Sequence, residues 1–370
     1  MINLVDVIYY CHDDLKDPHE VIEKHKPGMG YLPFIKEDLN VSFIKHLDYE
    51  GIHTIDGVKY GFFKSNNKFW HIPFKTHRFI KRSNPDLIIV QGLIFPLQVI
   101  ALKLALGNKC AIVVQHHGES PFKGLKIYLQ KLADHFISGY LFTATGISQE
   151  WIDKGIIKDP DKCFEILPAS TSLSKQEKDI CKEKSGLNNN QNFIWVGRLN
   201  SNKDPFCVLT AFENYLNFNP DARLYMIYQT EELLNEIKDL LSKKEKLSDS
   251  VQLVGKIPNS ELQSWLSAAD FYISASHKEG CGYALLEAMA CGCIPVVTDI
   301  PSFRKITDDG KYGFLYPPGD PDILLRTLVG TDTISKSEIS NAVVDHFNNK
   351  LSYKCIADDL HDICKSLSVK

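Results

Sequence analysis

The chain has 370 residues, and its composition, 44% hydrophobic and 24% charged, is typical of a soluble globular protein. This length is long for a single core and favours two domains. The formal net charge of −4 argues against a general nucleic-acid-binding protein, so we expect no nucleic acid among its partners. No apolar run approaches the roughly 18 residues that a membrane-spanning helix needs.

The ten cysteines are scattered, and no pair has the C-x-x-C spacing of a zinc site. Cys110, Cys207, Cys291 and Cys293 lie in apolar segments and are expected to be core residues. The first residues enter a strand without the basic segment and cleavage site of a signal peptide. We therefore expect a reduced, cytoplasmic protein without a metal site, either soluble or peripheral at a membrane.

Strands and helices are predicted to alternate through the first 170 or so residues. Buried strands are expected at 5–11, 41–47, 86–91, 110–115 and 140–146, with helices at 95–106 and 124–137. Residues 51–63 predict a hairpin that turns at Asp56-Gly57. Ser148 is expected to cap a helix that begins at Gln149. This pattern is typical of a doubly wound α/β domain.

A basic and aromatic stretch, residues 59–82, lies in a segment without any acidic residue. Its members are Lys59, Lys64, Lys68, Lys75, Arg78, Lys81 and Arg82, interleaved with Phe62, Phe63, Phe69, Trp70, Phe74 and Phe79. Such a composition suits a peripheral contact with the inner face of a membrane. It suits equally an anionic acceptor such as a lipid-linked diphosphate, or a solvated face over an aromatic core.

Two candidate ligand segments occur in this half. Gly28 and Gly30 could form a loop close to a ligand, and a simple turn explains them as well. His116 and His117 follow the strand at 110–115, where open α/β sheets bind ligands. A lone histidine at such a place is more often a packing residue.

Residues 173–190 are polar and charged and end in three asparagines, which predicts a linker between domains 1–172 and 191–350. After it, a strand at 193–196 leads to Arg198 and Lys203, and a strand at 251–254 leads to Lys256. Terminal helices are expected at 334–349 and 353–367.

The most informative segment is 270–297, which predicts a strand, a glycine-containing loop, a helix from Tyr283 to Cys291 and a second strand, in the order of a β-α-β unit. Gly280 and Gly282 permit close approach of a ligand, and the helix N-terminus offers N–H groups to an anion such as phosphate. Glu279 in the loop and Glu287 in the helix could accept hydrogen bonds from sugar and ribose hydroxyls. These features together indicate a nucleotide sugar.

Glu279 and Glu287, separated by seven residues in the run E-G-C-G-Y-A-L-L-E-A-M-A-C-G, resemble the E-x7-E signature of the retaining glycosyltransferases of family 4. Cys281 departs from the phenylalanine that is usual there. The resemblance implies the GT-B fold, in which two doubly wound, Rossmann-like α/β domains face each other across a cleft. It further implies that 1–172 binds the acceptor, that 191–350 binds the donor, and that 351–370 is a helix packed back on the first domain.

The resemblance also implies roles for single residues. Glu279 and His117, the latter in a His-Gly pair like that of the family, would be catalytic and contact the transferred sugar. Arg198 and Lys203 would flank the donor diphosphate, as in the G-R-x…K motif. Further donor contacts are expected from Lys256, near the nucleobase, from Glu287, on the ribose, and from Gly280, Gly282, Tyr283, Ala284 and Leu285. Gly28, Gly30 and His116 are weaker candidates near the acceptor.

The predicted function is transfer of a hexosyl group, with retention, from a UDP- or GDP-linked sugar to a hydroxyl of a sugar or lipid-linked acceptor. No cofactor and no metal are expected, since Arg198, Lys203 and the helix N-terminus supply the positive charge. Bacterial cell-surface polysaccharide or glycolipid synthesis is the expected pathway. Two alternatives remain open: a nucleotide-sugar epimerase of the GT-B fold, and a non-catalytic subunit that binds a nucleotide sugar.

Overall fold

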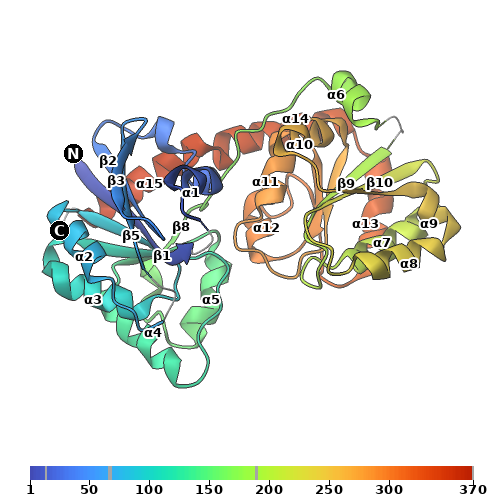
Figure 1. The fold of residues 1–370 in the computed structure, drawn as a ribbon. Helices are drawn as coiled ribbons and strands as arrows, with labels where there is room; N and C mark the ends of the chain where they lie inside the picture. Colours follow the sequence, from blue (N-terminus) through green and yellow to red (C-terminus); the bar gives the residue numbers. More distant parts are fainter. Residues whose placement is uncertain (13–14, 66–68, 188–190, 369–370) are drawn as a thin grey trace. The chain divides into compact units, whose positions relative to one another are not determined.

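The computed structural model describes residues 1–12, 15–65, 69–187 and 191–368. The chain forms two compact units, each of which contains a sheet of mostly or entirely parallel strands with helices packed against it (Figure 1). Unit 1 comprises Met1–Ala169 and Tyr353–Lys370, and unit 2 comprises Ser170–Ser352. The boundary between the two units, after Ala169, lies close to the predicted boundary at residue 172.

The sheet of unit 1 has the strand order β3-β4-β2-β1-β5-β6-β7-β8. Its strands are β1 (Ile2–His12), β2 (Leu39–Leu47), β3 (Gly51–Ile55), β4 (Val58–Phe63), β5 (Leu87–Gln91), β6 (Ala111–Gln115), β7 (Gly139–Phe142) and β8 (Cys163–Glu165). Neighbouring strands are parallel except for the hairpin β3–β4. The predicted turn at Asp56-Gly57 is confirmed, because both residues have positive φ (51° and 79°), as a type I′ turn requires.

The helices of unit 1 are α1 (Pro18–His25), α2 (Phe74–Arg82), α3 (Pro96–Leu106), α4 (Ile127–Ala133), α5 (Thr145–Asp153) and α15 (Tyr353–Ser368). Short 3-10 turns flank some of them, among them η1 (Lys26–Gly28), η2 (Leu32–Phe34) and η4 (Gly124–Lys126). The prediction that Ser148 caps a helix is wrong, because α5 begins at Thr145 and Ser148 lies within it. The Ser148 hydroxyl instead donates to the carbonyl of Thr145 (2.7 Å) within the helix.

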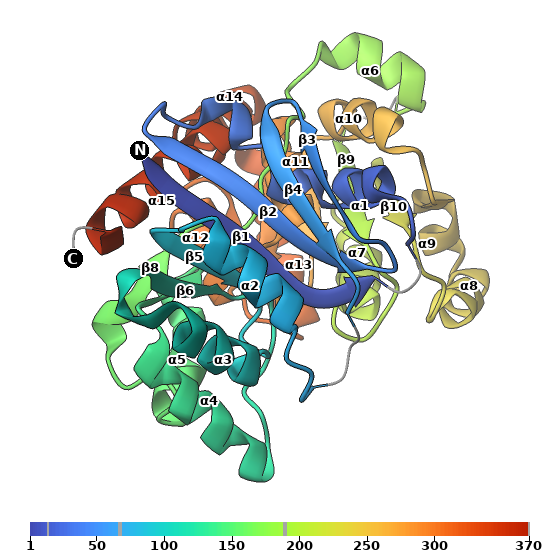
Figure 2. The same cartoon turned by 60° about the vertical axis from the view of Figure 1, so that its left-hand side comes forward.

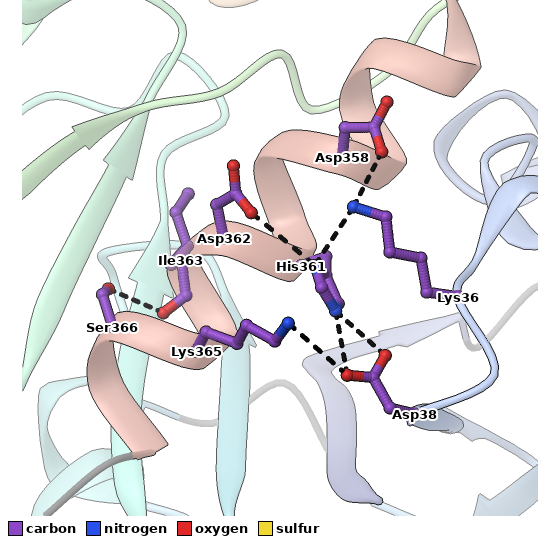
Figure 3. A network of polar contacts seen from close by, with 8 residues as sticks. All are labelled: Lys36, Asp38, Asp358, His361, Asp362, Ile363, Lys365 and Ser366. Atoms are coloured by element: carbon purple, nitrogen blue, oxygen red, sulfur yellow. Dashed lines mark hydrogen bonds and ion pairs between the residues drawn. The ribbon is translucent and has the colours of Figure 1, made fainter.

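The C-terminal helix α15 belongs to unit 1 and lies beside β1, as Figures 1 and 2 both show. A polar network joins it to the segment before β2 (Figure 3). The buried His361 contacts Asp38 through Nε2 (2.9 Å), and Lys36 pairs with Asp358 (3.1 Å). The network therefore ties the end of the chain to the sheet of unit 1.

The sheet of unit 2 has the order β11-β10-β9-β12-β13-β14, and neighbouring strands are parallel throughout. Its strands are β9 (Gln191–Gly197), β10 (Ala222–Tyr228), β11 (Val251–Gly255), β12 (Phe271–Ser274), β13 (Ile294–Thr298) and β14 (Phe314–Tyr316). Its helices are α6 (Lys178–Ser185), α7 (Pro205–Tyr215), α8 (Leu234–Ser242), α9 (Glu245–Ser250), α10 (Asn259–Ala268), α11 (Tyr283–Ala290), α12 (Pro301–Thr307), α13 (Pro321–Gly330) and α14 (Lys336–His346). Phe193 and Phe271 stack at the centre of the core, with ring centroids 4.9 Å apart.

The segment predicted as a linker, 173–190, contains α6, which packs on α10 within unit 2. Lys178 pairs with Asp270 (2.5 Å), and Cys181 is buried. The helix escaped prediction because charged residues dominate its sequence and it buries little apolar surface. The three asparagines at 188–190 lie outside the described residues.

The four cysteines predicted to be core residues are buried, as expected. Within the described residues, no helix is long and apolar enough to cross a bilayer. Those residues also contain no group of three or more His, Cys, Asp and Glu arranged to hold a metal.

Candidate functional site

The predicted donor-binding residues of unit 2 follow the carboxyl ends of three strands of one sheet. Arg198 and Lys203 follow β9, Lys256 follows β11, and Glu279 follows β12. Because β11, β10, β9 and β12 are consecutive and parallel, these residues emerge at the same edge of the sheet. This is the edge at which open α/β sheets bind ligands.

Lys203 and Glu279 form an ion pair that joins the loop after β9 to the loop after β12. Their side chains are only 15% and 14% exposed, so the pair is largely shielded from water. A buried carboxylate requires such a partner, and loss of either member leaves an uncompensated charge. The predicted phosphate-binding cation and the predicted sugar-binding carboxylate are therefore direct neighbours.

Further hydrogen bonds hold the same two loops together. The backbone N–H of His277 donates to the carbonyl of Asn202 (2.8 Å), and the side-chain amide of Asn202 donates to the carbonyl of Lys278 (3.0 Å). The His277 ring contacts Asp204 (3.0 Å), which also caps α7. Asn202, Asp204 and His277 are not among the predicted site residues, although each lies within two residues of one.

Gly282 is the N-cap of α11 and has a φ of +71°, a left-handed conformation that favours glycine. A Cβ there would lie 3.0 Å from the side chains of Phe303 and Ile306, so the close packing of α12 also requires glycine. Gly280 lies in the preceding loop, and Tyr283 and Ala284 form the first turn of the helix. Leu285 is a core residue, and its N–H is already bonded to the carbonyl of Gly282 (3.0 Å), so the expected donor contact does not fit it.

Glu287 lies on α11 one turn after Tyr283. Burial raises the pKa of its carboxyl to about 7, and a hydrogen bond from the side chain of Tyr283 acts in the opposite direction. The carboxyl is therefore divided between its neutral and charged forms near neutral pH. Such a group can accept hydrogen bonds from a diol at little further cost in desolvation.

Arg198 and Lys256 have exposed side chains. Neither forms an ion pair with any described residue, so both are available to an anionic ligand at this edge.

The two histidines at the end of β6 differ in environment. His116 is buried against Phe142 (centroids 5.2 Å apart) and Trp151, and its Nε2 contacts the carbonyl of Glu119 (3.0 Å). The backbone N–H of Gly118 donates to its Nδ1 (3.3 Å), so both ring nitrogens of His116 already have partners within the protein, and its role near the acceptor stays a prediction. His117, in contrast, is exposed to solvent.

The Nε2 atom of His117 is hydrogen-bonded to Oε1 of Gln91, at the end of β5 (2.5 Å). The loss of water around its imidazole lowers the pKa of His117, and the negative charge of Glu119 opposes this shift. Gln91 also donates to the buried Asp6 on β1 (2.5 Å). Asp6 and Gln91 were not predicted from the sequence; the available signal was a polar residue within an apolar strand.

The predicted glycine loop has a structural explanation at Gly30. A Cβ on Gly30 would lie 2.3 Å from the ring of Tyr353, at the start of α15. The Tyr353 hydroxyl donates to the carbonyl of Pro27 (2.9 Å) in the same loop. A Cβ on Gly28, at the end of η1, would lie 3.7 Å from its nearest neighbour, the carbonyl oxygen of Pro168.

Residues 177–328 match the family model described as glycosyl transferases group 1. The chain is 24% identical over 345 residues to alpha-monoglucosyldiacylglycerol synthase of Streptococcus pneumoniae, which covers 87% of this chain and 76% of that protein. It is also 24% identical over 285 residues (73% of this chain and 75% of the relative) to N-acetylgalactosamine-N,N'-diacetylbacillosaminyl-diphospho-undecaprenol 4-alpha-N-acetylgalactosaminyltransferase of Campylobacter jejuni.

Solved structures resemble the whole chain. A glycosyltransferase from Rickettsia africae superposes with a TM-score of 0.76 at 16% identity, covering 100% of this chain and 99% of that one. Anabaena HepE in complex with UDP superposes with a TM-score of 0.73 at 15% identity, covering 99% and 100%. At such identities the likeness establishes the fold. Together with the match of residues 177–328 to the glycosyl transferases group 1 and the similarity to named glycosyltransferases, it indicates a glycosyltransferase of the GT-B fold.

Proposed function

We propose that this glycosyltransferase transfers a hexosyl group, with retention of anomeric configuration, from a nucleotide diphosphate sugar to an acceptor hydroxyl. The observation that carries the proposal is the Lys203–Glu279 pair at the sheet edge that also holds the N-terminus of α11. A cation, a carboxylate and a helix N-terminus are the complement of a diphosphate joined to a polyol.

In this proposal, Arg198, Lys203 and the first turn of α11 stabilise the charge that develops on the departing diphosphate. Glu279 accepts hydrogen bonds from hydroxyls of the transferred sugar, and Glu287 accepts them from the ribose. Lys256 contacts the nucleobase, and His117 accepts a hydrogen bond from a substrate hydroxyl. Because the protein supplies the positive charge, transfer is expected to proceed without a divalent metal.

The first test is a thermal-shift panel of nucleotide sugars with and without EDTA, followed by transfer assays with the donor that stabilises the protein. Glu279→Gln should lower kcat by roughly 100-fold or more with a smaller change in donor Kd. Glu261→Gln, an exposed carboxylate on α10, is the matched control. Loss of activity in EDTA would contradict metal independence. Donor turnover without any acceptor would favour the epimerase, and donor binding without any turnover would favour the binding subunit.

We further propose that the acceptor is lipid-linked and that unit 1 binds the surface of an anionic membrane. In the stretch 59–82, Phe62 is buried, Lys64 and Lys75 pair with Asp48 and Glu50, and Lys68 lies outside the described residues. Trp70 and Phe74 remain 71% and 77% exposed. The stretch thus contributes fewer groups than its composition suggests.

A second exposed surface extends this one. Leu125, Tyr128 and Leu132 are exposed at a spacing that places them on one face of the η4–α4 segment, with Lys126 and Lys131 beside them. The segment adjoins the stretch 59–82, because Phe122 packs against Phe69 (centroids 5.4 Å apart) and the Lys126 ammonium lies 5.3 Å from the centroid of the Phe69 ring. Apolar and basic side chains on one face suit an anionic lipid surface.

A pocket of about 230 Å³ lies where these two segments meet. It is lined largely by aromatic rings, those of Tyr9, Tyr10, Phe69, Phe95 and Phe122. Gln98 donates to the carbonyls of Phe69 (3.1 Å) and His71 (2.9 Å) and so fixes the loop that forms one wall. An apolar pocket beside a basic and apolar face supports an acceptor with a hydrocarbon portion.

Vesicle sedimentation tests the membrane contact. The protein should bind vesicles of phosphatidylglycerol and not of phosphatidylcholine, and Leu125→Glu with Tyr128→Glu should weaken that binding by roughly tenfold or more. Phe218→Glu removes a comparably exposed ring from unit 2 and is the matched control. Equal binding of the double variant and the control would contradict the proposed face.

A further inference from the structure

We propose that Asp6 and Gln91 are positioning residues for His117, which hold the proton of its neutral imidazole on Nε2 and leave Nδ1 as the acceptor for a substrate hydroxyl. This inference rests on the proposed role of His117 in substrate binding. The three residues come from β1, from β5 and from the loop after β6, which are consecutive in the sheet of unit 1. They form a continuous chain of hydrogen bonds at its carboxyl edge.

The polarity of this chain follows from its first member. An ionised Asp6 can only accept, so the group of Gln91 that lies 2.5 Å from its Oδ2 must be the amide NH₂. The other end of the Gln91 amide is then the carbonyl oxygen, which also only accepts. The His117 Nε2 atom, 2.5 Å from that oxygen, must therefore carry a proton.

The acceptor role of Asp6 follows from its bond with the Gln91 amide and from the buried cation on the neighbouring strand, although burial on balance raises its pKa. Burial raises the pKa of Asp6, while the charge of the buried Lys45 on β2 and the hydrogen bond from Gln91 act against this rise. Asp6 and Lys45 are both almost fully buried, and Oδ1 of Asp6 has no hydrogen-bond partner among the described residues. A buried carboxylate with an unsatisfied oxygen is costly to the fold, which indicates a role other than stability.

Glu119 braces the two loops that carry Gln91 and His117. Its carboxylate accepts from the backbone N–H of His117 (2.6 Å) and from that of Leu93, two residues after Gln91 (3.2 Å). Gly92, between them, has a φ of +102°, and a Cβ there would lie 2.9 Å from Oε1 of Glu119. The backbone at both ends of the Gln91–His117 bond is thereby fixed.

The consequence for chemistry is a defined direction of hydrogen bonding. Within the described residues no group bonds Nδ1 of His117, so this atom is the one left to a ligand. An unprotonated Nδ1 accepts a hydrogen bond from a hydroxyl, whereas in the opposite tautomer the Nδ1–H group could only donate one to the hydroxyl oxygen. Asp6 thus selects, through two hydrogen bonds, what His117 can recognise.

The test is long-range ¹H–¹⁵N NMR of the full chain with ¹⁵N-labelled histidine, without substrate. His117→Gln identifies the His117 signals among those of the thirteen histidines. The wild-type protein should show a single Nε2–H tautomer. In Asp6→Asn the Gln91 amide can face either way, so both tautomers should be populated. The pKa of His117, which faces Glu119, His116 and Lys45, should fall further, because Lys45 is then uncompensated.

Asp48→Asn removes an exposed carboxylate from the same unit and should leave the His117 spectrum and titration unchanged. Should Asp6→Asn fail to fold, the pair Asp6→Asn with Lys45→Met removes both buried charges and should show the same mixture of tautomers. In transfer assays Asp6→Asn and Gln91→Leu should each lower kcat/KM by roughly 3-fold to 10-fold, as expected for one misdirected hydrogen bond.

Two failures are distinguishable. An unchanged His117 tautomer and titration in Asp6→Asn, in a protein whose His117→Gln variant is inactive, would overturn the positioning chain alone. Full activity of His117→Gln would overturn the role of His117 in substrate binding, whatever the NMR spectra show.

Discussion

At the scale of single residues, the charged form of Glu287 is expected to lower the stability of the fold and to strengthen donor binding. Its pKa is raised to about 7 in the folded chain, so folding disfavours the charged form. The free energy of unfolding should therefore fall as pH rises from roughly 4.5 through 7, by up to roughly 3 kcal/mol. Glu287→Gln should melt at a higher temperature than the wild-type protein at pH 8 and close to it at pH 4.5. Equal melting temperatures at pH 8 would argue against a strained carboxyl.

The same residue makes a prediction about binding. A ribose diol donates more effectively to a carboxylate than to a carboxylic acid, so the donor should bind the ionised form of Glu287 more tightly. Donor affinity, measured by calorimetry, should rise by about threefold to tenfold between pH 6 and 8. In Glu287→Gln this rise should disappear, while Glu261→Gln should retain it. A pH-independent affinity in the wild-type protein would count against the ribose assignment.

The histidine pair shows where prediction from sequence stops at this scale. The end of a parallel strand was enough to place both His116 and His117 near the ligand edge. The choice between them depends on which ring turns into the core, and His116 packs against Trp151, more than 30 residues away along the chain. Asp6 and Gln91 were invisible for the same reason, since hydrogen bonds between strands join residues that are far apart in sequence.

At the scale of elements, the loop of Gly30 and helix α15 are fitted to each other. Gly30→Ala should destabilise unit 1 by roughly 1 to 3 kcal/mol, because the new methyl group would overlap the Tyr353 ring, 2.3 Å away. Denaturant unfolding measures the change. In the Tyr353→Ala background the same substitution should cost much less, whereas Gly28→Ala, at 3.7 Å from its nearest neighbour, should be tolerated. Equal costs of Gly30→Ala in both backgrounds would show that Tyr353 is not the cause.

Elements with a clear apolar period were predictable, and those defined by tertiary contacts were not. The β12–α11–β13 unit could be predicted because buried strands flank a segment of strong helix formers that ends at Gly292. Helix α6 could not, because its position on α10 depends on polar contacts such as the Lys178–Asp270 pair. The start of α5 was missed because a serine can bond within a helix as well as cap it.

At the scale of the whole molecule, the two units have separate cores and different ionisable groups. Unit 1 buries His46 and His77, and burial lowers the pKa of each to about 4. His46 bonds the carbonyl of Ile8 (2.7 Å) and the hydroxyl of Thr76 (2.9 Å), and His77 contacts the Tyr9 hydroxyl (3.0 Å). Burial away from water, and not these contacts, is what disfavours the protonated form of each ring.

The sign of the resulting pH dependence follows from these shifts. An unfolded histidine binds a proton near pH 6.5, whereas the folded ones do so only near pH 4. The stability of unit 1 should therefore fall as pH drops below about 6.5, by roughly 2 kcal/mol at pH 5.5 for the two together. In unit 2 the raised pKa of Glu287 acts in the opposite direction over the same range, while the half-buried His346, whose pKa burial lowers, acts in the same direction as the two histidines of unit 1.

Hydrogen exchange at pH 7.5 and 5.5, corrected for intrinsic rates, should accordingly show protection lost in β1, β2 and α2 while β9 and β12 retain theirs. His46→Gln and His77→Gln should each reduce the pH dependence of unit 1 even where they lower its stability at pH 7.5. His135→Gln, at an exposed position in the same unit, should not alter it. Equal loss of protection in both units would mean that other groups, and not these two buried rings, govern the acid response.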